Sequence, residues 1–189
     1  MKRFLFIVTF LFTSLSGQAV FAQDNAESAV TNSFEVSGTS TIHDWTMTSE
    51  DVTLTATVDT TENGFSLSEL TGTIPVESLK SGKGKMDKNA YEALKKNKFP
   101  GITFQLTSPL AFQAGETVAT EIDVTIAGNT QKMPIEGTIN QESNNLTITG
   151  AKTFKMTSFG VEPPSLMFGS IKTGDEITVA YSIQLDTNQ

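Results

Sequence analysis

The chain lacks cysteine altogether and has a single histidine, His43, among its 189 residues. Without cysteine it can form no disulfide bond and carry no cysteine-linked lipid anchor. One histidine without cysteine also excludes zinc sites of the usual composition. A hydrolytic triad would have to use His43, but its neighbour Asp44 adjoins it in the chain, whereas a triad needs a carboxylate from a distant segment. We therefore expect no catalytic residue, no metal and no cofactor, and we interpret the His43–Asp44 pair as part of a strand end or turn.

Positive charge is also scarce. The sequence has 13 lysine and arginine residues against 21 aspartate and glutamate residues, which gives a formal net charge of −8. An acidic surface of this kind repels nucleic acid and the anionic head groups of a lipid surface. We therefore expect no nucleic-acid partner.

A long hydrophobic run is present only at the beginning of the chain. Residues 1–22 combine a positive start, an apolar stretch and small residues before position 23, which is typical of a secretory signal peptide. A transmembrane anchor is the alternative, but Phe4–Leu15 supplies only 12 residues, where about 20 are needed to cross a bilayer. We expect cleavage near Ala22-Gln23, a flexible leader at 23–31, and one domain at 32–187 without an integral membrane segment. The expected location is periplasmic or secreted.

Within that domain, apolar and polar residues alternate with a period of two, which predicts strands with one buried and one solvated face. Threonine is frequent on the polar face and suits strand conformation. The alternating segments are Phe34–Ile42, Val52–Val58, Phe65–Val76, Ile102–Leu106, Val118–Ile126, Met133–Ile139, Leu146–Gly150 and Ile177–Leu185.

Short turn sequences separate these segments and predict antiparallel hairpins. They are Asn63-Gly64, Gly128-Asn129, Asn144-Asn145 and Thr173-Gly174-Asp175. A change of phase between Leu67 and Leu70 also predicts a bulge near Glu69. The fold class is therefore all-β with a short helix, and we predict an eight-stranded antiparallel β-barrel. A barrel of this size either is filled by side chains or holds one small ligand, and the alternation does not decide between the two.

Two segments interrupt the alternation. Met86–Lys98 has apolar residues at a spacing of four, with Asp87 as the expected N-cap and Pro100 as the stop, and it predicts a helix that either closes one end of the barrel or packs on its surface. The stretch 154–172 is apolar, irregular and rich in methionine and phenylalanine, which adapt to apolar ligands. It either contacts a ligand or plugs the barrel.

Five motifs in this order resemble those of the YceI-like family of lipid- and polyisoprenoid-binding proteins. They are Ser37–Trp45, Met86–Tyr91, Lys98–Phe104, Lys155–Gly160 with Pro163-Pro164, and Ile171–Val179. The resemblance implies a lipocalin-like eight-stranded barrel whose lumen holds an elongated isoprenoid or related amphiphilic lipid. It implies neither enzymatic activity nor a bound metal.

These observations predict an exported binding protein that holds an elongated isoprenoid or other amphiphilic lipid for transport or storage. The alternatives are a filled barrel that acts as a structural or protein-interaction module in the envelope, and a hydrolase or isomerase built in the cup of the barrel. The segments 77–100 and 157–172 are expected to lie together at the mouth. The apolar strand phase and this mouth provide the predicted ligand contacts: Phe34, Val36, Trp45, Phe65, Leu67, Phe104, Leu106, Ile122, Val124, Ile135, Phe154, Phe159, Leu166, Met167, Val179 and Tyr181.

Overall fold

The computed structural model describes residues 32–187, without the side chains of Leu166 and Met167. The expected signal peptide, its cleavage site and the leader lie outside the described residues. Within them the chain forms eleven strands, one α-helix and three short 3-10 helices. Their bounds are β1 Ser33–Ser40, β2 Trp45–Ser49, β3 Thr53–Thr61, β4 Gly64–Pro75, η1 Val76–Ser78, α1 Gly84–Ala93, β5 Gly101–Leu106, β6 Leu110–Phe112, β7 Thr117–Ile126, β8 Asn129–Glu142, β9 Asn145–Lys155, η2 Met156–Phe159, β10 Ser165–Leu166, η3 Met167–Gly169 and β11 Ile171–Asp186.

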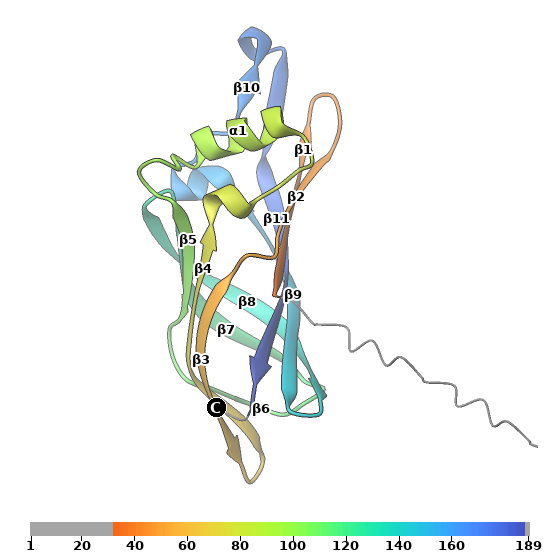
Figure 1. Cartoon of the computed structure of the whole chain (residues 1–189), viewed down its shortest axis with the longest axis vertical. Helices are drawn as coiled ribbons and strands as arrows, with labels where there is room; N and C mark the ends of the chain where they lie inside the picture. Colours follow the sequence, from red (N-terminus) through yellow and green to blue (C-terminus); the bar gives the residue numbers. More distant parts are fainter. Residues whose placement is uncertain (1–31, 188–189) are drawn as a thin grey trace, which may run out of the picture.

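The strands form one curled antiparallel sheet, which Figure 1 shows with α1 lying across one end. The strand order is β2-β1-β11-β9-β8-β7-β5-β4-β3, with β6 paired to β4 and β10 paired to β11. This half-barrel confirms the predicted lipocalin-like class. The main path has nine strands rather than eight, because β2 forms a strand of its own. Its five residues include only two large apolar side chains, so alternation does not reveal it.

The two edge strands are β2 and β3. The edge of β2 is covered by η1 and by the two residues that follow it, Leu79 and Lys80. The backbone of Thr48 exchanges two hydrogen bonds with Lys80, at 2.8 and 2.9 Å. The buried Ser49 hydroxyl lies 2.7 Å from the Ser78 hydroxyl. These contacts satisfy edge groups that would otherwise stay open for pairing with another chain.

The predicted turns are confirmed at three of four positions, and the bulge is confirmed at Ser68, which the β3–β4 register skips. The predicted turn at Thr173-Gly174-Asp175 is wrong, because these residues lie inside the continuous strand β11. The register between β1 and β11 shifts there. A Cβ atom at position 174 would lie 2.6 Å from the Thr39 hydroxyl, so the glycine serves close approach of two strands rather than a turn.

The predicted helix is shorter than expected, and Asp87 does not cap it. No side chain caps its start at Lys83, and Asp87 instead accepts hydrogen bonds from Ser81. These bonds lower the pKa of the Asp87 carboxyl below its ordinary value. The helix ends because Lys95 adopts a left-handed conformation (φ 56°), and the N–H of Lys96 donates to the Tyr91 carbonyl at 2.9 Å. This is a Schellman ending with lysine where glycine is usual.

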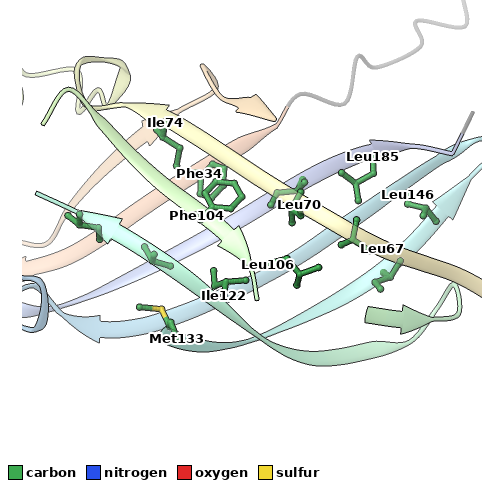
Figure 2. Close-up of a cluster of buried hydrophobic side chains, with 14 of the residues drawn as sticks. Phe34, Leu67, Leu70, Ile74, Phe104, Leu106, Ile122, Met133, Leu146 and Leu185 are labelled. Atoms are coloured by element: carbon green, nitrogen blue, oxygen red, sulfur yellow. The ribbon is translucent and has the colours of Figure 1, made fainter. Parts of the chain in front are cut away.

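The end of the half-barrel away from α1 is filled with side chains, and we call it the filled end. Leu146 and Ile139 have no exposed surface there. Figure 2 shows Leu67, Leu146 and Leu185 gathered on one side of the buried cluster, while Ile74, Phe34 and Phe104 lie on the other. The second group borders the cavity described next.

Candidate ligand-binding cavity

A cavity of about 450 Å³ lies at the α1 end of the half-barrel, which we call the hollow end. Inward residues of β1, β2, β4, β5, β7, β8, β9 and β11 form its wall, and α1 contributes residues such as Ala90. The wall is almost entirely apolar. Its volume falls in the range of about 300–1,000 Å³ that is usual for small-molecule sites. The chain therefore combines a filled end and a hollow end.

Eleven of the sixteen predicted contacts line this cavity. They are Phe34, Val36, Trp45, Phe104, Ile122, Val124, Ile135, Phe154, Phe159, Val179 and Tyr181.

Three of the other five predicted contacts do not line it. Phe65, Leu67 and Leu106 belong to the buried core and are absent from the cavity wall. They share the inward strand phase, but phase specifies a face of the sheet and not a position along the barrel. The side chains of Leu166 and Met167 lie outside the described part of the chain.

Three aromatic residues of the wall lie over glycines on neighbouring strands. Their register pairs each ring residue directly with a glycine. A Cβ atom on any of these glycines would overlap the ring or hydroxyl that covers it. The pairs are Trp45 with Gly38, Phe104 with Gly72, and Tyr181 with Gly150. Because each ring occupies the space above its glycine, the rings lie close to the sheet and leave the lumen open.

Tyr181 also spans two strands. Its hydroxyl crosses Gly150 and donates a hydrogen bond to the Glu136 carbonyl of β8 at 2.7 Å. Burial raises the pKa of the Tyr181 hydroxyl above its ordinary value, and the nearby Glu136 charge adds to the effect. The phenol therefore remains a neutral donor, as a tyrosine at an apolar wall must be.

The ladder between β8 and β9 ends next to Tyr181, which pairs with Gly150 of β9. Their ladder extends only as far as Thr138 opposite Thr149. Beyond this pair β8 continues along β7, while β9 continues along β11. Pro134 lies in the part of β8 that pairs with β7 alone, and it has no N–H to donate to a ladder. We call this part of the sheet, where residues 129–137 and 150–155 form no ladder with each other, the β8–β9 gap.

The 3-10 helix η2 spans the outer end of this gap. The side-chain amides of Asn129 and Gln131 on β8 donate to the carbonyls of Phe159 and Ser158, at 2.7 and 3.1 Å. On its other side, Thr157 donates from its N–H and its hydroxyl to the Asp175 carboxylate, at 2.9 and 2.7 Å. These bonds lower the pKa of Asp175. They hold Phe159 in place, where it is buried against Phe154.

The two segments expected at the mouth do lie together. The cavity wall takes Met86, Ala90 and Leu94 from the first segment, and Val161 and Pro164 from the second. The first segment is tied down by Tyr91, whose hydroxyl donates to the Leu79 carbonyl at 2.8 Å and accepts from the Lys80 amine at 2.9 Å. The helix thus forms a cover for the hollow end.

Sequence reasoning missed several wall residues, including Met47, Leu70, Ile74, Ile177 and Lys152. Met47 escaped because β2 was not predicted. Ile177 lies on the same strand face as Val179, so its phase was a sufficient signal. Lys152 alternates with Gly150 and Phe154 on the inward face of β9, but its charge concealed that position.

His43 sits in the turn between β1 and β2, where it is exposed. Its backbone N–H and carbonyl both contact the Ser40 hydroxyl, at 3.2 and 2.7 Å. Its ring Nδ1 lies 2.8 Å from the Asp44 carbonyl, and no carboxylate orients it. Across 32–187, no three histidine, aspartate or glutamate residues gather closely enough to hold a metal ion. Among the same residues, no helix has both the length and the apolar character required to span a membrane.

Comparison with known proteins gives a family match over most of the chain. The family model of the YceI-like domain matches residues 21–185. No curated protein matches the sequence.

Solved structures show the same fold at low sequence identity. BcnA of Burkholderia cenocepacia is 16% identical with a TM-score of 0.64, covering 80% of this chain and 96% of its own. The YceI protein of Campylobacter jejuni is 16% identical with a TM-score of 0.59, covering 74% and 83%. A polyisoprenoid-binding domain from Saccharophagus degradans, implicated in plant cell wall breakdown, is 10% identical with a TM-score of 0.57, covering 82% and 92%.

Proposed function

Because the chain belongs to the YceI-like family, we propose that it is an exported binding protein that holds an elongated isoprenoid or other amphiphilic lipid in its cavity. Transport or storage of that lipid would be its role. The observation that carries the proposal is the apolar cavity of about 450 Å³ at the hollow end.

The chemistry of the wall favours a hydrocarbon chain. Transfer of each buried CH₂ group from water contributes about 0.8 kcal/mol, so a ligand of many methylene and methyl groups gains affinity along its whole length. A polar ligand would lose hydration against this wall without gaining hydrogen bonds. The neighbouring Saccharophagus degradans domain, described as polyisoprenoid-binding, supports the same ligand class.

Export is part of the proposal and is supported by the pattern of residues 1–22. The absence of catalysis also stays a prediction. The alternative, a filled barrel that serves as a structural or protein-interaction module, has less support because the α1 end is hollow.

Solvent extraction of the purified protein followed by mass spectrometry tests the proposal. We expect an isoprenoid or another long amphiphilic lipid in the extract. Val36→Trp should fill the cavity and reduce the recovered lipid severalfold, because Val36 faces the lumen from β1. Glu35→Trp is the matched control, since the neighbouring Glu35 is exposed on the outer face and should not change recovery. An extract without lipid, or equal recovery from Val36→Trp and the native protein, would contradict the proposal.

A further inference from the structure

Every charged residue of the cavity wall is a lysine. Among the residues that the structure describes, Lys83, Lys85 and Lys152 line it, whereas no aspartate or glutamate does. This is unexpected in a chain with a formal net charge of −8, in which acidic residues outnumber basic ones. The cavity therefore has the opposite charge to the molecule that surrounds it.

Lys152 differs from the other two lysines in its position. Lys83 and Lys85 are exposed around the first turn of α1, whereas Lys152 is half-buried on the inward face of β9. It pairs with Val179 in a cross-strand row that continues to Val36 and Met47. All four residues of this row line the cavity. Lys152 is thus the one cationic member of an apolar row in the wall.

No hydrogen bond or ion pair joins the Lys152 side chain to any other residue within 32–187. A lysine at an apolar wall normally extends its amine to water or pairs it with an anion, because burial of an unpaired charge is costly. The β8–β9 gap begins at residue 150, two residues before Lys152 on the same strand, because the ladder ends at Thr149. Because the Lys152 side chain is half-buried and not fully enclosed, its amine can reach water.

We propose that Lys152 binds the anionic head group, a phosphate or carboxylate, of an amphiphile whose apolar tail fills the cavity. The proposal rests on the lipid-binding function proposed above and names the class of its ligand. The tail contacts the apolar wall, and the head lies at the β8–β9 gap. There the ammonium group donates charge-assisted hydrogen bonds to it, while the remaining oxygens stay hydrated.

Two probes that share one tail separate the contribution of the head group to the affinity from the contribution of the tail. Farnesol and farnesyl phosphate share the same isoprenoid chain and differ in charge. Trp45 is the only tryptophan of the sequence and lines the cavity, so its fluorescence reports binding of both probes. We expect the native protein to bind farnesyl phosphate at least about tenfold more tightly than farnesol, because a hydrogen bond to a charged group contributes that much affinity. Added salt should weaken the binding of farnesyl phosphate and leave the binding of farnesol unchanged.

Lys152→Met should remove this preference while leaving the affinity for farnesol within about twofold, because methionine keeps the apolar length of the side chain. Lys155→Met is the matched control. Lys155 lies on the same strand with its side chain exposed, so its removal should leave the preference intact. A thermal melt of each variant confirms folding, and Lys152→Arg should retain the preference.

The outcomes distinguish the two proposals. If neither probe binds, the lipid-binding function itself fails. If farnesol binds as tightly as farnesyl phosphate, or Lys152→Met keeps the preference, the function stands and the head-group site fails. If the double variant Lys83→Met, Lys85→Met removes the preference while Lys152→Met does not, the head group binds at the start of α1 and the site at Lys152 fails.

Discussion

The lumen exists because three rings lie over three glycines. Gly72 illustrates the arrangement, since a Cβ atom there would overlap the ring of Phe104 on the neighbouring strand. Glycine in a strand usually weakens it, and an aromatic residue opposite compensates by covering the exposed backbone. In this protein the same pairing also determines where the barrel is hollow.

Gly72→Ala should therefore push the Phe104 ring into the cavity. Overpacking of this kind costs about 1–3 kcal/mol of unfolding free energy, and we expect lipid retention to fall as well. Urea unfolding and lipid extraction measure the two effects. Gly84→Ala is the control, because a Cβ atom there meets nothing within 4 Å. Unchanged stability and retention in Gly72→Ala would contradict the proposed role of the glycine.

His43→Ala should leave lipid binding unchanged. The ring bonds only to the carbonyl of the next residue, in an exposed turn, although His43 belongs to the cavity wall. Fluorescence titration with farnesol and farnesyl phosphate checks this expectation. Loss of binding by a folded variant would show that the histidine takes part in recognition.

At the scale of elements, the sequence predicted the long strands and the existence of a helix, and it failed where tertiary contacts decide. Alternation identified eight strands because each has several apolar residues on one face. It missed β6 and β10, which have only three and two residues, and β2, whose buried Ser49 is held by Ser78. It also extended the helix past Lys95, because a left-handed lysine leaves no signal in a sequence. The β8–β9 gap was likewise hidden, since both strands continue past it.

The inner face of α1 should be required for lipid retention. Ala90→Asp would place a charge against the apolar tail, and we expect severalfold faster loss of lipid from a barrel that remains folded. Lys88→Asp introduces the same residue on an exposed position of the same helix and should retain lipid. Exchange of bound lipid into empty vesicles measures the rate. Equal rates in the two variants would show that α1 is a surface helix without influence on the cavity.

At the scale of the whole molecule, the half-barrel has a filled end and a hollow end, and we expect stability to depend mainly on the first and binding on the second. The inward phase could be predicted for most wall residues, but the division into a filled and a hollow end could not. Phe65, Leu67 and Leu106 have the same pattern as the wall residues and lie in the core. What distinguishes the ends is the register of glycines and rings on strands far apart in the sequence, which a single sequence does not reveal.

Leu146→Ala tests this separation. Leu146 has no exposed surface in the filled end, and its truncation should cost about 2–5 kcal/mol of unfolding free energy. The fraction of folded protein that carries lipid should stay the same, because Leu146 does not line the cavity. Calorimetry and lipid extraction below the melting temperature provide both values. A proportional loss of lipid would mean that the two ends act as one unit.

The central claim is that the hollow end holds an amphiphilic lipid, and a crystal structure of protein purified without delipidation tests it most directly. We predict continuous elongated density along the wall between Phe104, Ile135 and Val179, with its polar end near Lys152. A cavity filled only by water, or collapsed onto its own side chains in protein that was never exposed to detergent or solvent, would contradict the claim.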